Sequence, residues 1–189
     1  MTWIQTFEGR EFDLVNPGPD MVSAEDIAHA LSQLCRYNGH THRFYSVAEH
    51  SVLVSDWLAS QGHRPGIVLA GLLHDAHEAY VSDLPAPLKR MMDGAARAWW
   101  EALVARLDVV IGEWAGLPRE ALLHAVHVRE ADARILLDER AALLGPAPRS
   151  WGPVEDLEPL GVGVIGLPPW QARARFLERL YRLAPLVEE

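Results

Sequence analysis

Ionisable side chains crowd the end of one apolar stretch of this chain. The run Val68–Leu73 is followed closely by His74, Asp75, His77, Glu78 and Asp83. Burying a charged group is costly unless another charge or a metal ion compensates it. The adjacent His74 and Asp75 therefore indicate a metal site or a catalytic centre, and a purely structural His–Asp pair is the alternative.

Two residues from other segments can complete a metal site with this pair. Ser46 and Glu49 form a capping box that opens a helix with His50 in its first turn, and Asp132 lies in a helix-patterned segment far downstream. Imidazole and carboxylate form a mixed N/O ligand set that suits a borderline divalent ion. The four ligands His50, His74, Asp75 and Asp132 would leave positions on a six-coordinate ion for water, as a reactive metal requires. We expect one divalent ion per chain, with Mn, Co, Zn, Mg, Fe and Ni all left open.

At these residues the sequence resembles the HD-domain phosphohydrolases, whose pattern is a His, a His-Asp pair and a distant Asp. The stretch from His74 to Lys89 is similar to bacterial HD-domain 5'-deoxynucleotidases. Three earlier segments are similar to phage and bacterial relatives that include dATP triphosphohydrolases, namely residues 26–31, 35–41 and 44–51. The resemblance covers residues 1–140 and is weak after that. It implies an all-α fold, an HD-domain helical bundle.

Glu78 and Asp75 are the expected catalytic residues. On a helix, Glu78 lies four residues from His74 and projects near the metal pair without being forced to bind it. A carboxylate there can accept a proton as water attacks phosphorus. The resemblance implies this role, because the matching glutamate of the deoxynucleotidases is catalytic. The alternative for Glu78 is a solvated carboxylate at a helix end.

Five residues are expected to bind the substrate. By composition alone Asp83 is a turn residue, but the resemblance implies that it contacts the sugar 3'-hydroxyl. Lys89 is the only lysine of the chain and falls within the family-like stretch. Arg36 suits phosphate recognition, and the resemblance supports it. Tyr37 stands where the family has tryptophan and could lie beside a base, and Arg129 is a weaker phosphate candidate.

The remaining histidines leave room for a second reading of the site. His124 and His127 precede Asp132, and two-metal HD proteins recruit extra histidines there. On an ideal helix they would lie about 80° and about 140° from Asp132. A two-metal HD oxygenase is therefore one alternative, and the other histidines are expected to be structural or exposed.

The expected function is metal-dependent hydrolysis of a small deoxynucleotide. A dNMP 5'-nucleotidase releasing phosphate is slightly favoured by the motif around His74. The Cys35–His50 stretch favours a dNTP triphosphohydrolase releasing tripolyphosphate. A non-enzymatic nucleotide-binding regulator would predict loss of a metal ligand or of Glu78, and neither is missing.

Composition narrows the class of protein. A chain of 189 residues suits one domain over 1–189. The net charge of −9 argues against general nucleic-acid binding. A lone cysteine, Cys35, and the lack of a leader-like or long apolar run favour a cytoplasmic protein without a membrane anchor. A homodimer or an assembly of dimers is expected mainly from the resemblance, and Trp99, Trp100 and Trp114 could be core or a subunit contact.

Turn and capping signals set the expected elements. A short N-terminal β-hairpin is expected over 6–14, and residues 145–166, rich in Pro and Gly, form an irregular arm. The other segments are helix-patterned. Their expected ranges are 23–34, 46–62, 65–80, 88–115 with a kink at Asp93-Gly94, 118–144 and 168–183.

Overall fold

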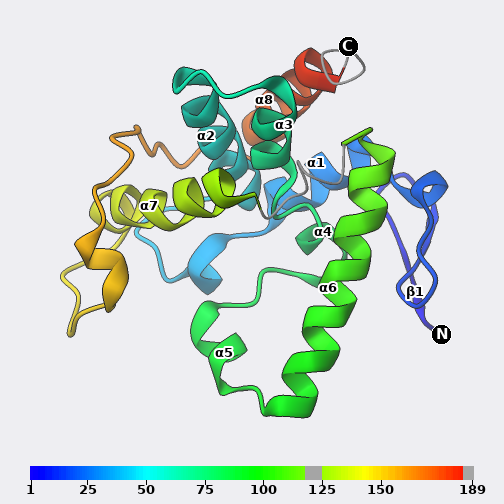
Figure 1. The fold of residues 1–189 in the computed structure, drawn as a ribbon, viewed down its shortest axis with the longest axis horizontal. Helices are drawn as coiled ribbons and strands as arrows, with labels where there is room; N and C mark the ends of the chain where they lie inside the picture. The colour runs from blue at the N-terminus through cyan, green and yellow to red at the C-terminus, as the bar shows by residue number, and fades with distance from the viewer. Residues whose placement is uncertain (118–124, 185–189) are drawn as a thin grey trace.

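The computed structural model describes residues 1–117 and 125–184, and helices dominate it (Figure 1). The helices are α1 (Ala24–Gln33), α2 (Val47–Ser60), α3 (Pro65–Leu73), α4 (Glu78–Val81), α5 (Ala86–Met91), α6 (Gly94–Trp114), α7 (Val126–Leu143) and α8 (Pro169–Leu183). Single 3-10 turns span Pro19–Met21, Arg36–Gly39 and Pro153–Asp156. The two strands, β1 (Trp3–Gln5) and β2 (Glu11–Asp13), pair antiparallel. The predicted all-α fold with a short N-terminal hairpin is confirmed.

The helix α3 lies at the centre of the core, packed against α2 and α8. Its residues from Ile67 to Leu73 are all buried, as expected of a helix that is apolar on every side. Gly71 allows the close approach of α2, because a Cβ there would collide with Leu58. This rigid packing fixes the C-terminal end of α3, where His74 and Asp75 follow.

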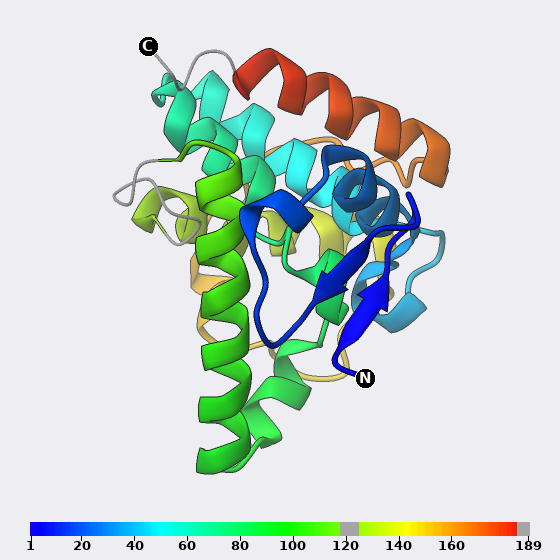
Figure 2. The same cartoon turned by 90° about the vertical axis from the view of Figure 1, so that its right-hand side faces the viewer.

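The N-terminal hairpin packs against α4 (Figure 2). The buried ring of Phe12 on β2 stacks on Tyr80 of α4, with 3.7 Å between ring centroids. The first strand lies before the predicted 6–14 range, because Thr6 to Arg10 form the turn, with Gly9 at a φ of 79°. The hairpin thereby helps to hold the helix that begins with Glu78.

Two predicted helices are each broken in two. The expected helix over 65–80 ends at Leu73 and resumes as α4 at Glu78, although no glycine or proline lies between them. The expected helix over 88–115 is α5 and α6, because Asp93 caps a new helix by accepting a hydrogen bond from the Ala96 amide at 2.8 Å. The expected 118–144 helix is α7 over its described part, and residues 118–124 lie outside the described residues.

Two further segments flank the bundle. We call residues 82–102 the α5–α6 arm; both views show α5 and the N-terminal half of α6 extending away from the other helices (Figures 1 and 2). We call residues 145–168 the strap; it runs beside α7 on its way to α8 (Figure 1). Over residues 1–117 and 125–184, no helix combines the length and the apolar character needed to cross a membrane.

Candidate metal centre and adjoining cavity

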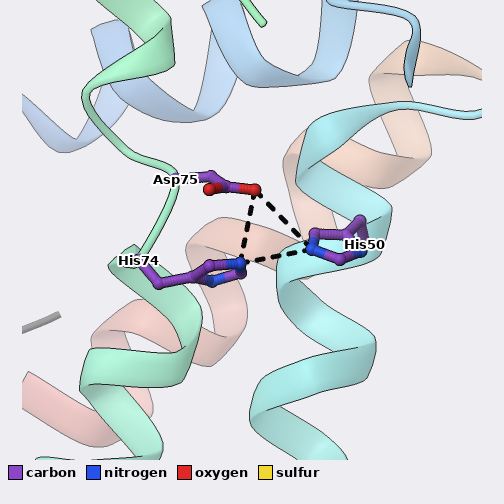
Figure 3. Close-up of side chains that lie close together, drawn as sticks. All are labelled: His50, His74 and Asp75. Carbon is purple, nitrogen blue, oxygen red and sulfur yellow. Dashed lines mark hydrogen bonds and ion pairs between the residues drawn. The ribbon is translucent and has the colours of Figure 1, made fainter. Parts of the chain in front are cut away.

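The four predicted metal ligands converge from three helices. His50 lies in the first turn of α2, His74 and Asp75 follow α3, and Asp132 lies on α7. The two His Nε2 atoms are 3.2 Å apart, and Asp75 Oδ2 lies 3.6 Å from His50 Nε2 and 3.3 Å from His74 Nε2 (Figure 3). Asp132 Oδ1 lies 3.2 Å from His50 Nε2 and 3.7 Å from His74 Nε2. The helix packing therefore gathers all four side chains around one point.

The hydrogen bonds on the far side of each imidazole fix its tautomer. His74 Nδ1 lies 2.8 Å from the carbonyl oxygen of Gly71, which can only accept, so Nδ1 carries the proton. His50 Nδ1 lies 2.7 Å from Oε1 of Glu139, a carboxylate. In the neutral rings both Nε2 atoms are then acceptors. Two lone pairs that face each other at 3.2 Å repel unless a cation lies between them, either a metal ion or a proton on a ring nitrogen. In the metal-free chain burial lowers the pKa of both histidines, but Glu139 beside His50 and Asp75 beside His74 raise it above the ordinary value.

This arrangement fits a divalent ion. Two ligand atoms about 2.1 Å from one ion lie roughly 3.0 Å apart at a right angle and roughly 3.4 Å apart at a tetrahedral angle. The separations of 3.2 to 3.3 Å among His50, His74 and the nearest carboxylate oxygens fall in this range. His50, His74 and Asp75 form a group that could hold a metal, with Asp132 beside it.

The two carboxyl groups of the centre are held ionised. Burial raises the pKa of Asp75, but His74 and its hydrogen bond outweigh burial and hold that pKa well below its ordinary value. Burial also raises the pKa of Asp132, and hydrogen bonds from His50 and His74 lower it well below the ordinary value. Both groups are therefore available as anionic ligands.

Glu139, which the sequence reading missed, anchors the centre from behind. Its carboxylate is fully buried and accepts hydrogen bonds from Tyr37 at 2.5 Å and Tyr45 at 2.9 Å, besides that from His50. Its pKa is lowered to about 2, because Arg36 and His50 outweigh the effect of burial. The available signal was its spacing: it lies seven residues, two helical turns, after Asp132.

Glu78 is a buried acid close to the ligands. Its residue exposure is 3%, and its Oε2 has no hydrogen-bond partner in the described chain. Burial first, and then the negative charges of Asp75 and Asp83, raise its pKa well above the ordinary value. Asp83 is half-buried, and burial raises its pKa as well. The predicted geometry of one continuous helix was wrong, but Glu78 still lies within the electrostatic reach of Asp75.

A cavity of about 390 Å³ adjoins the centre. One side is formed by three of the ligands, His74, Asp75 and Asp132. Two predicted phosphate-binding residues, Lys89 and Arg129, line it, and neither has a hydrogen bond or ion pair with the described part of the chain. The other lining residues are His77, Met92, Arg97, Trp100, Glu101, Val104, Ala105 and Val128.

Arg36 and Tyr37 do not line this cavity and lie on the Glu139 side of the centre. Arg36 is buried, and its guanidinium lies 3.4 Å from Asp75 and 3.4 Å from Glu139. Tyr37 has a φ of 57° and directs its hydroxyl to Glu139 rather than to the cavity. Its ring lies 6.2 Å from that of Trp151 in the strap. The structure thus places both residues around Glu139.

The other histidines have separate environments. His77 is buried with its Nδ1 3.0 Å from Asp108, and it lines the cavity without belonging to the candidate ligand group. The ring of His127 lies 4.5 Å from that of His63, and both line a different hollow with Trp57 and Arg134. His124 lies outside the described residues. In the part of the chain that the structure covers, His127 therefore does not join the candidate ligands.

Two proteins match the chain over nearly their whole length. The uncharacterized protein YfdR of Escherichia coli (strain K12) is 35% identical over 187 residues, which cover 98% of this chain and 98% of that protein. The uncharacterized protein RCAP_rcc00048 of Rhodobacter capsulatus is 33% identical over 184 residues, 94% of this chain and 93% of that protein. No protein-family model matches the sequence.

Proposed function

The chain belongs to the family of YfdR and RCAP_rcc00048, and we propose that it is a metal-dependent phosphohydrolase of the HD-domain type. Its substrate is a small deoxynucleotide, and the favoured reaction is hydrolysis of a dNMP to a nucleoside and phosphate. The observation that carries this proposal is the convergence of two imidazole Nε2 atoms and two carboxylates on one point, those of His50, His74, Asp75 and Asp132. A divalent ion bound there would polarise the phosphate and lower the pKa of water.

The chain's own residues have distinct tasks in this proposal. Glu78 accepts and holds the proton of the attacking water, a role that suits a buried carboxyl group whose pKa is raised. Lys89 and Arg129 offset the charge of the phosphate from the cavity side. Asp83 does not line the cavity, and its task, binding the sugar 3'-hydroxyl, rests on the resemblance to the deoxynucleotidases. Arg36 reaches the phosphate only by exchanging one of its present carboxylate partners, so it acts mainly through Asp75 and Glu139.

A dNTP triphosphohydrolase is the second candidate. Three cationic side chains, Lys89, Arg97 and Arg129, line the cavity, which is more positive charge than one phosphate requires. The charge of Arg97 is offset by Glu101, which lies 2.8 Å away, so Lys89 and Arg129 remain as the cations for the phosphate. The number of available cations therefore favours a dNMP over a dNTP as the substrate.

Product analysis tests the proposal. Metal-stripped protein would be supplied with Mn, Co, Zn or Mg and incubated with dNMPs, dNTPs and the matching ribonucleotides. Free phosphate from dNMPs supports the 5'-nucleotidase, and tripolyphosphate from dNTPs supports the second candidate. No product with any metal would refute hydrolysis and favour a nucleotide-binding regulator.

Glu78→Gln gives the matching mutational test. We expect kcat to fall by about 10²- to 10⁴-fold, the usual contribution of a positioned acid–base group, with the metal content of the protein unchanged. Glu130→Gln is the control, because Glu130 is an exposed carboxylate on α7 that pairs with Arg134 outside the cavity. Equal activity of Glu78→Gln and the parent protein would remove Glu78 from the mechanism.

The ligand is a small molecule in this proposal, with neither nucleic acid nor a membrane as partner. The cytoplasmic location and the homodimer or assembly of dimers stay predictions. Size-exclusion chromatography with light scattering over a range of protein concentrations would test the second of them.

A further inference from the structure

The cavity beside the candidate metal centre is lined by two chemically different groups of side chains. The metal ligands and the cations Lys89 and Arg129 are suited to a phosphate. The arm and the adjoining turns of α6 add an apolar part to the lining, Met92, Trp100 and Val104, next to the Arg97–Glu101 pair. A site for phosphate alone has no use for an apolar part. The cavity therefore suits an amphipathic ligand with one anionic end and one apolar end.

The helical repeat of α6 explains how this part of the lining is built. Its cavity-lining residues are spaced by three and four, which places them on one helix face. They are Arg97, Trp100, Glu101, Val104 and Ala105. Trp99 lies off this face, does not line the cavity, and is 67% exposed, whereas Trp100 is partly buried. Two adjacent tryptophans thus have different surroundings.

We propose that Trp100 is the platform on which the nucleobase of the substrate stacks, with Arg97 and Glu101 beside it. This inference rests on the proposed function, and it assigns the base-binding part of that same site. The Arg97–Glu101 pair offers one hydrogen-bond donor group and one acceptor group, which suits the polar edge of a base. The cavity volume of about 390 Å³ is at the small end of the range for small-molecule sites, as one nucleotide requires.

The position of Trp100 on the arm has a physical consequence. No residue of 82–102 is buried, so the arm gains little from packing against the rest of the chain. A bound base would bury apolar surface of Trp100 and Met92 and so add contacts that the arm lacks.

Binding of two non-hydrolysable probes isolates the base. The probes are the methylenephosphonate analogues of dAMP and of 2-deoxyribose 5-phosphate, titrated calorimetrically into the manganese-supplied full-length protein. We expect Trp100→Ala to weaken the dAMP analogue by roughly tenfold, the size expected for one lost base–aromatic stack, with the sugar analogue little changed. Trp100→Phe should keep most of the affinity, and Trp99→Ala is the matched control with both affinities unchanged.

Other outcomes would overturn the inference. Equal weakening of both probes by Trp100→Ala would mean that the substitution disturbs the whole cavity, and no weakening of either would mean that the base lies elsewhere. If base-dependent binding persists while no substrate is hydrolysed, the base subsite stands and the proposed hydrolysis fails. If dNMPs are hydrolysed with the same KM by Trp100→Ala and the parent protein, hydrolysis stands and the base subsite fails.

Discussion

The strap and the α5–α6 arm flank the same site but are held in opposite ways. The strap is irregular, yet two carboxylates bind the backbone of its C-terminal part. The buried Glu49 accepts from the amides of residues 165–167 at 2.6 to 3.0 Å, and the half-buried Asp138 accepts from those of residues 160–162 at 2.8 to 3.2 Å. The arm is helical, yet none of its residues is buried. Regular structure therefore says little about how firmly a segment is held.

The anchors of the strap are chain neighbours of the centre. Glu49 precedes His50, and Asp138 precedes Glu139, so the hydrogen bonds that hold the strap also fix the helices that carry these two side chains. The arm instead supplies the cavity side with Lys89 and Trp100. We interpret this difference between the strap and the arm as functional: the strap helps to keep the candidate metal centre rigid, and the arm forms an adaptable wall of the ligand cavity.

Removing the Glu49 carboxylate, which binds three amides of the strap, should give the largest loss of stability. Glu49→Ala leaves three amides of the strap without their acceptor, and we expect the free energy of unfolding to fall by about 2 to 4 kcal/mol. Urea unfolding monitored by circular dichroism would measure it. Glu49→Gln keeps one acceptor oxygen and should lose less. A change in Glu49→Ala below about 1 kcal/mol would show that the strap is not held by this carboxylate.

Glu139→Gln should act on the metal rather than on the fold. The substitution weakens the bond that orients His50, and outer partners of this kind typically contribute about 10- to 100-fold in metal affinity. A chelator competition with Zn or Mn measures that affinity, and Glu130→Gln on the same helix is the control. Unchanged affinity in Glu139→Gln would contradict the role of Glu139 in orienting His50.

Gly166→Ala tests whether the strap needs its close approach to the chain. Gly166 has a φ of 81°, and an added Cβ would lie 2.7 Å from the backbone oxygen of Phe44. We expect a loss of about 1 to 3 kcal/mol in unfolding free energy from conformation and crowding together. Gly161→Ala is the matched control, because Gly161 has a φ of 76° but open space around it. Equal losses in both variants would remove the steric part of the argument.

The residues of the candidate metal centre could be predicted from the sequence because their chemistry is in their residue types. His74 and Asp75 after an apolar run, His50 behind a capping signal and Asp132 on a helix all lie at one centre. Glu139 could not be singled out, because α7 carries many charged residues and its burial depends on Tyr37 and Tyr45 from another segment.

The strap and the helix breaks were harder for physical reasons. Ser46 accepts from the Glu49 amide as predicted, but the Glu49 side chain does not complete the capping box, because it binds amides more than a hundred residues away. Such long-range partners leave no local pattern. The break after Leu73 has no glycine or proline signal. Asp93-Gly94 did indicate an irregularity, but the structure has two separate helices there instead of one kinked helix.

A substitution in the α5–α6 arm should have the smallest effect on stability. Leu88 is 45% exposed on α5, does not line the cavity and has no buried neighbour within the arm, so Leu88→Ser should change the unfolding free energy by no more than about 0.5 kcal/mol. The same urea titration measures it at two protein concentrations. Hydrogen exchange should likewise be faster for amides of the arm than for those of residues 160–162 and 165–167 in the strap. A loss above about 1.5 kcal/mol that grows with protein concentration would mean that a second copy covers the arm. The contrast between strap and arm would then hold for the monomer alone, because the apolar side of the arm would have its partner in the assembly.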